Sequence, residues 1–251
     1  MAYTCDLELE FLEKLPSEEL GPLVNCLTHD SDGESRHTEE LTGRDLYKEH
    51  HPDHHQYWDE IAGELQCFGA NSIATLFRGG KGVEYFEILL DVAKAIDLEH
   101  DDDSEMEDIE AALLMRVFEE SLDKMTPEQR EEAVRTMDLK TTDFSKQAIL
   151  AAIQTAIRLG GFTPYKMAVI VAHGAFNATG ANLVGHGLSL GATQVLTKSI
   201  AKFAGPIGWA ITAAWTAYDI AGPAYRVTIP ACVHIAYLRQ LDAYKQQEAA
   251  A

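Results

Sequence analysis

A histidine-rich segment is the part of this sequence whose residue types and spacing come nearest to a metal-binding pattern. His50 and His54 are four residues apart, as are His51 and His55, and this spacing places two imidazoles on one face of a helix, as zinc sites use. Pro52 lies between the pairs and argues against an unbroken helix through all four. The segment is therefore either a zinc site, which would suit a metal-dependent hydrolase, or a solvated loop that leads into a helix.

A second candidate for metal binding is the polar segment that runs from Thr28 to Glu39. Counted from Thr28, Asp30 and Asp32 take the third and fifth positions of a calcium loop, Gly33 the sixth and Glu39 the twelfth. Thr28 stands where calcium loops usually have an aspartate, which weakens the match. The alternative is a polar turn built on the Asp-Gly pair.

The charge of the chain is strongly acidic and unevenly distributed. The formal net charge is -20, yet only three of the 40 acidic residues lie from Lys146 onward, together with eight of the 20 Lys and Arg residues. Such asymmetry indicates two functional halves. It also excludes a nucleic-acid-binding protein, because a chain this acidic repels phosphate and has no basic stripe.

The four cysteines have no CxxC spacing, and the N-terminus has no basic segment of the kind that opens a signal peptide. We therefore expect reduced thiols and a cytoplasmic protein, with association at a membrane left open.

The elements that must position these residues are predicted to be helices, because apolar residues recur with helical spacing and no run alternates as a strand does. Leu7, Phe11 and Leu15 keep this spacing, and the Pro16–Ser17 pair starts a further helix. Further helices are predicted at 56–66, which a break at 68–72 follows, and at 85–96. A capping box of Ser104 and Glu107 predicts the start of the next helix. The last of this group is predicted from Thr126 to about Met137, with Pro127 and Gln129 completing its start signal.

The C-terminal part is apolar. Residues 167–197 contain no Asp, Glu, Lys or Arg, but His, Asn and Gly residues interrupt them, so a packed helical hairpin fits better than a membrane span. The stretch from Gly205 to Arg239 contains three prolines, which predicts two or three short buried helices. We expect Asp219 and Arg226, within this stretch, to pair with each other or with other polar groups, because an unpaired buried charge is costly.

The fold predicted from these observations is an all-α, multi-helix bundle with an acidic N-terminal half and a Gly/Ala-rich apolar C-terminal half. Its expected divisions are a small helical module at residues 1–40, an acidic helical domain at 41–145 and an apolar helical domain at 146–251.

Three segments, at residues 6–41, 51–96 and 224–239, resemble the YaaW family of bacterial proteins over long ordered strings. The first is similar to a small module that opens many members. The middle of the chain also resembles the helical ubiquinol–cytochrome c chaperones. The resemblance implies no catalytic residue. Together with the buried-charge argument it gives these candidate binding positions: His54, Trp58, Glu64, Asn71, Arg78, Asp219, Tyr225 and Arg226.

The function that we expect is non-enzymatic: the apolar C-terminal helices engage a membrane surface or a hydrophobic protein partner. The alternatives are a chaperone or adaptor that holds a protein client between helices, and the metal-dependent hydrolase of the histidine segment. We expect no cofactor, with zinc and calcium as the metals that the two candidate sites would take, and a homo-oligomer stays open.

Overall fold

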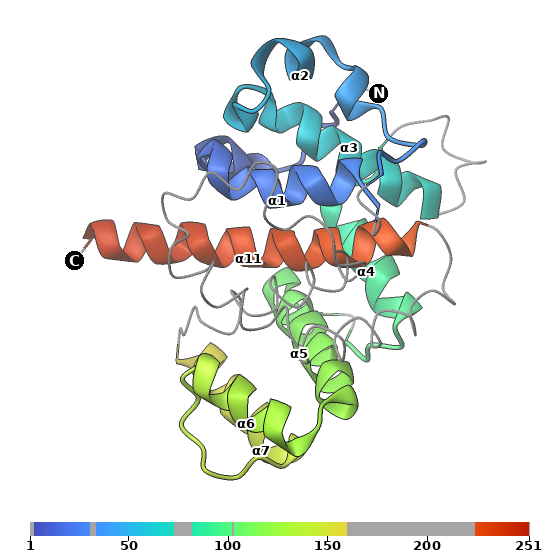
Figure 1. The fold of residues 1–251 in the computed structure, drawn as a ribbon. Coiled ribbons are helices and arrows are strands. Elements are labelled where there is room, and N and C mark those ends of the chain that lie inside the picture. Colours follow the sequence, from blue (N-terminus) through green and yellow to red (C-terminus); the bar gives the residue numbers. More distant parts are fainter. Residues whose placement is uncertain (1–2, 31–33, 73–81, 102, 160–223, 251) are drawn as a thin grey trace.

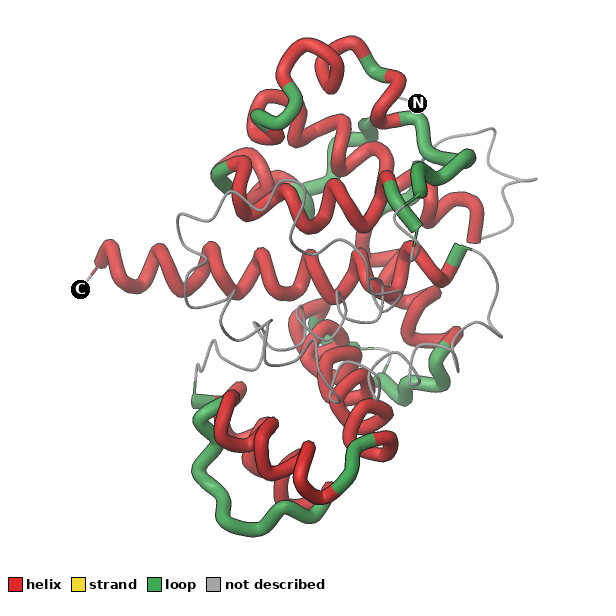
Figure 2. The backbone as a smooth tube through the Cα atoms, in the orientation of Figure 1, coloured by secondary structure: helices red, strands yellow, loops and turns green. Residues whose placement is uncertain are grey.

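The described part of the protein is an assembly of helices. A computed structural model describes residues 3–30, 34–72, 82–101, 103–159 and 224–250 (Figures 1 and 2). Within these ranges there is no strand, and an isolated bridge between His29 and Ser35 closes one loop. The prediction of an all-α bundle is therefore confirmed.

The described helical elements follow one another along the chain from Glu10 to Ala250. They are η1 (Glu10–Lys14), α1 (Ser17–Thr28), η2 (Leu41–Gly43), α2 (Asp45–His50), η3 (His54–Tyr57), α3 (Trp58–Ser72), α4 (Tyr85–Ala95), α5 (Met106–Lys124), α6 (Pro127–Thr136), α7 (Lys146–Arg158) and α11 (Tyr225–Ala250).

Helix α11 is the centre of the described fold. It crosses the middle of Figure 1, with α1 to α3 on one side and α5 to α7 on the other, and it contacts α1, α3, α4, α5 and η1. A helix that is apolar on all sides is stable only when other elements cover all of it. Its buried residues follow this rule, since they are consecutive over more than two turns: Val227, Thr228, Ile229, Pro230, Ala231, Cys232, Val233, His234, Ile235 and Ala236.

The prediction that prolines divide this region into short helices is wrong for its described part. Pro230 lies inside α11, and the helix continues through it for five more turns. An internal proline costs about 3 kcal/mol. Burial of side chains on every side of α11 outweighs that cost, because each large apolar side chain contributes about 1.5 to 3 kcal/mol. Residues 205–223 lie outside the described part.

Helix α3 is longer than predicted, because the expected break at residues 68–72 is helical. Gly69 explains the difference. A Cβ at this position would lie 2.4 Å from Cγ1 of Ile88 on α4, so the missing side chain lets the two helices approach closely. The glycine therefore serves helix packing and does not end the helix.

Helix starts were predicted with mixed success. Thr126 and Gln129 form the expected reciprocal capping box at the start of α6, and Pro127 is the first helical residue. The capping box predicted at Ser104 is wrong: α5 begins after Glu105, and the Ser104 hydroxyl instead accepts the N–H of Asp101.

The helix predicted from Leu7, Phe11 and Leu15 is a 3₁₀ turn. The buried leucines there, Leu9, Leu12 and Leu15, are three residues apart, whereas Leu7 is 79% exposed. A 3₁₀ helix has three residues per turn, so the period of the apolar residues is shorter than the one expected.

One hydrophobic cluster connects the described parts of all three expected divisions. It contains Leu12 and Leu23 from the N-terminal module, Ile61 from α3, and Ile229 from α11. The boundaries at residues 40 and 145 stay predictions. Of the helices in the described ranges, none combines the length and the apolar character that crossing a membrane requires.

Candidate functional site

The histidine segment folds as the end of α2, a short turn and η3. His54 is buried, and its Nδ1 lies 2.5 Å from the hydroxyl oxygen of Tyr57. The ring of His51 stacks on Tyr47 with centroids 4.7 Å apart and meets the His54 ring edge-on at 5.5 Å. Gly21 of α1 makes room for the imidazole, since its Cβ would lie 3.4 Å from Nε2 of His54.

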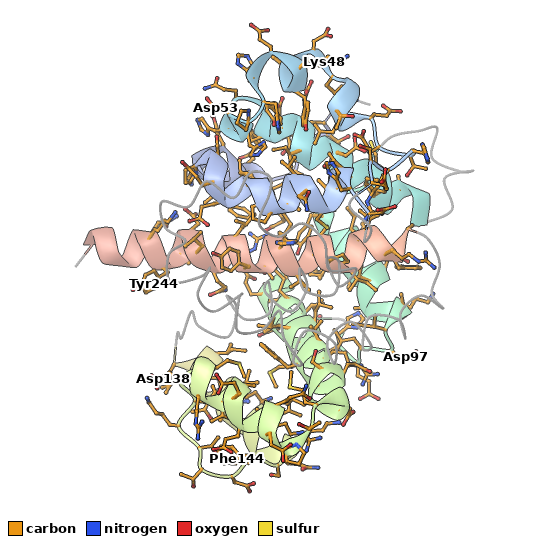
Figure 3. All side chains as sticks on the ribbon, in the orientation of Figure 1. Lys48, Asp53, Asp97, Asp138, Phe144 and Tyr244 are labelled. Carbon is orange, nitrogen blue, oxygen red and sulfur yellow. The ribbon has the colours of Figure 1, made fainter. Side chains whose placement is uncertain are left out.

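The rings of this cluster pack on one another, with His54 and Tyr57 buried and His51 exposed. Burial lowers the pKa of His54 to about 4, so the imidazole is neutral at pH 7. The predicted zinc ligands His50, His51, His54 and His55 do not converge: no group of three or more His, Cys, Asp or Glu side chains in the described part is arranged to hold a metal ion. The nearby Asp53 carboxylate instead accepts a hydrogen bond from the Ser17 hydroxyl at 2.5 Å (Asp53 is labelled in Figure 3).

The predicted calcium loop is described only in part, because Asp32 and Gly33 lie outside the described residues. Two of its other positions have partners within the protein. The Thr28 hydroxyl donates to the carbonyl of Val24 at 2.8 Å, and the Glu39 carboxylate accepts the N–H of Thr42 at 2.9 Å.

Glu64 is a buried carboxyl group on α3. Its Oε1 accepts the N–H of Glu40 at 3.1 Å, and the side chains of Glu39 and Arg44 lie near enough to act on it electrostatically. Burial raises the pKa of Glu64 to about 7, against the lowering effect of the Glu40 N–H. Burial also raises the pKa of the nearby Cys67 thiol to about 11, so this cysteine is not a thiolate at neutral pH.

The remaining predicted positions are dispersed. Trp58 packs edge-on against Tyr3 with centroids 5.5 Å apart, at the start of α3. Tyr225 begins α11, where burial and then a hydrogen bond with Asp91 raise its pKa to about 12, and Arg226 is exposed rather than buried. Arg78, Asp219 and the side chain of Asn71 lie outside the described residues, so the expected Asp219–Arg226 pair does too.

A polar network in the described core, centred on Glu110 and Arg239, was not predicted. Glu110 of α5 is 1% exposed, and its Oε1 accepts hydrogen bonds from the Tyr85 hydroxyl at 2.8 Å and from Nε of Arg239 at 3.3 Å. Nη2 of Arg239 donates to the carbonyl of Glu8 at 2.9 Å, and the guanidinium lies 4.8 Å from the centre of the Phe11 ring. This network connects α4, α5, α11 and the N-terminal segment through hydrogen bonds.

The sequence held a signal for this network. Glu110 interrupts the apolar stripe of α5, which otherwise consists of Met106, Ile109, Leu113 and Val117, so a carboxylate points into the core. Arg239 is one of only three charged residues in the apolar stretch from Gly205 to Arg239. Burial raises the pKa of Glu110, and the positive charge of Arg239 counteracts that rise.

Comparison with known proteins identifies the family. A "UPF0174 protein" of Helicobacter pylori is 45% identical over 95% of this chain and 93% of its own length. The "UPF0174 protein YaaW" of Escherichia coli K12 is 32% identical over 95% of this chain and 96% of its own. The chain belongs to the UPF0174 family. The predicted resemblance to the YaaW proteins is thereby confirmed.

Two family models match separate parts of this UPF0174 member. Residues 53–233 match the family described as "Ubiquinol-cytochrome C chaperone", which confirms the second predicted resemblance, and residues 3–37 match a "Domain of unknown function (DUF3944)". A further Helicobacter pylori UPF0174 protein is 39% identical over 80% of this chain and 97% of its own length. No solved structure matches.

Proposed function

We propose that this chain is a chaperone-like binding protein that holds a hydrophobic segment of a protein partner. The observation that carries the proposal is the match of residues 53–233 to the chaperone family, which covers most of the chain. The polar clusters of the described part agree with it. The Glu110–Arg239 network joins helices, and His54 is buried, neutral and in contact with the Tyr57 hydroxyl.

The uncharged residues 167–197 are the part of the sequence that we propose binds the partner. The other apolar stretch, from Val227 to Leu238, is buried by the protein's own helices. Residues 167–197 follow α7, which packs on α5, and precede α11, which is fixed in the core. Residues 167–197 themselves lie outside the described part; their sequence is rich in apolar residues and has no formal charge.

Site-specific photo-crosslinking of the full chain in bacterial cells tests the proposal. A benzophenone amino acid replaces Leu188, inside the uncharged stretch, and in a matched control it replaces Glu49, which is exposed on α2. We expect one reproducible protein adduct from position 188 that is absent from position 49 and that a Leu190→Asp substitution removes.

Flotation of the same full chain with phospholipid vesicles separates this proposal from the membrane hypothesis. If the protein floats with vesicles and position 188 gives no protein adduct, the partner is a lipid surface and the chaperone proposal is wrong. Equal adducts from positions 188 and 49 would also contradict it, because such contacts do not depend on the uncharged stretch.

A further inference from the structure

The segment between the two family matches has few apolar anchors. Residues 38–52, which we call the connector, lie between the matched residues 3–37 and 53–233 and form η2, α2 and the turn before η3. Leu41 is the one buried residue of this described range, and α2 contains none. A segment that buries so little apolar surface can open locally while the rest of a protein stays folded.

Glu64 of α3 ties the main chain of the connector to the core. Its Oε1 accepts the N–H of Glu40 at 3.1 Å, directly before Leu41 in the chain, and η2 contacts α3. The Glu64 side chain is buried. Movement of the connector away from α3 would break this hydrogen bond and let water reach the carboxyl group.

A second carboxyl group of α3 lies beside this tie. Glu60 precedes Glu64 by four residues, which places both carboxyl groups on one face of the helix. The Oε2 of Glu60 is buried and has no hydrogen-bond partner within the described part. Burial raises the pKa of Glu60, as it does that of Glu64, so ionising both groups at once is costly.

The charged groups around this pair are mostly negative. The groups that act on Glu60 or Glu64 come from the connector and from α3: Glu39, Glu40, Arg44, Asp45, Asp59 and Cys67. Arg44 is the cation of this set, and it also pairs with Glu40 at 3.6 Å. An ionised Glu64 therefore meets repulsion from carboxylates of the connector, and this repulsion is relieved when the connector leaves α3.

We propose that Glu64 is a proton-controlled clasp: its protonated carboxyl group holds the connector on α3, and loss of the proton releases the connector. Burial favours the protonated form while the connector is docked and raises the pKa of Glu64 from 4.5 to about 7. Raising the pH through this window therefore shifts the equilibrium towards the open connector, and the shift levels off above it. The join between residues 3–37 and 53–233 thus responds to pH, whatever the protein binds.

Hydrogen exchange of the full chain, followed by mass spectrometry at pH 5.5 and pH 8, tests the clasp. Dividing the intrinsic rate at each pH by the observed rate gives a protection factor that is free of the chemical effect of pH. From the two pKa values of Glu64 we expect the protection of connector peptides to fall about thirtyfold between these conditions. At both pH values the connector should be less protected than residues 227–238 of α11, because it opens without global unfolding.

Glu64→Gln is the matched variant, since glutamine keeps the shape and the acceptor oxygen but does not ionise. Its connector protection should change much less with pH, whereas Glu49→Gln, at an exposed position on α2, should follow the unmodified chain. An equally large fall in Glu64→Gln would overturn the inference.

Two results from the unmodified chain would also overturn it, so the test does not depend on the folding of a variant. One is connector protection that stays constant between pH 5.5 and pH 8. The other is equal protection of the connector and α11, because the connector would then open only when the whole protein unfolds.

Discussion

Replacing Glu64 by glutamine should stabilise the protein in mildly alkaline solution and have little effect in acid. The side chain is 5% exposed, and its pKa is raised from 4.5 to about 7. In the unfolded chain the carboxyl group loses its proton near pH 4.5, whereas in the folded chain it keeps the proton up to about pH 7. Stability therefore falls as the pH rises through this window, and it levels off above it.

The magnitude follows from the pKa difference. One pKa unit corresponds to 1.36 kcal/mol, so ionised Glu64 costs the folded state about 3 kcal/mol above pH 7. Glutamine has the same shape, stays neutral and still offers an oxygen to the N–H of Glu40. We expect Glu64→Gln to gain about 1 to 3 kcal/mol at pH 8 relative to its effect at pH 4.5, where both side chains are neutral in the folded state.

Urea unfolding followed by circular dichroism at pH 4.5 and pH 8 measures this difference. The control is Glu49→Gln, at an exposed position on α2, which removes the same charge without relieving burial. A change of about 1 kcal/mol corresponds to about 3 °C in Tm for a chain of this size. If Glu64→Gln changed stability equally at the two pH values, burial of the carboxylate would not be its dominant interaction and the reasoning would be wrong.

Three further substitutions test the packing of the core and the helix ends. Arg239→Met should lower the free energy of unfolding by about 3 to 5 kcal/mol, because it leaves the buried Glu110 carboxylate uncompensated, and a second change, Glu110→Gln, should recover part of the loss in urea titrations. Gly69→Ala should lower the free energy of unfolding by about 1 to 3 kcal/mol, because the added Cβ would overlap an α4 side chain. The control Gly43→Ala should be close to neutral, because no atom lies within 4 Å of its added Cβ. Equal Tm values for the two variants would contradict the close approach of α3 and α4. Asp138→Gly should raise stability by about 0.5 to 1 kcal/mol in thermal melts (Asp138 is labelled in Figure 3). This exposed residue follows the end of α6 with a φ of 51°, which glycine adopts without steric cost. An unchanged or lower Tm would show that the Asp138 side chain contributes more to stability than the backbone strain costs.

The elements that local sequence determines were predictable. The start of α6 depends on Thr126, Pro127 and Gln129, which are neighbours in the chain, so a local rule was sufficient. The helix predicted at 85–96 agrees with α4 (Tyr85–Ala95) because its apolar face has a clear helical period.

Features that depend on distant residues were not predictable in the same way. Gly69 and Pro230 both have strong local tendencies to interrupt a helix, and both lie inside helices because of what packs against them: Ile88 on α4 in one case, and several helices around α11 in the other. The partnership of Glu110 with Arg239 joins residues 129 positions apart, so the sequence could show a carboxylate within an apolar stripe and an arginine within an apolar stretch, but not that the two are partners.

The position of α11 changes the meaning of the charge asymmetry. The acidic residues and the apolar C-terminal residues do not form two separate bodies in the described part, because α11 lies inside the helices of the acidic half. The apolar stretch from Val227 to Leu238 belongs to the core, and this burial accounts for its composition without any partner. The binding hypothesis therefore depends on another feature, the uncharged residues 167–197. Crosslinking from position 188 tests this dependence directly, because an adduct there that is absent from position 49 can arise only from contacts of the uncharged stretch.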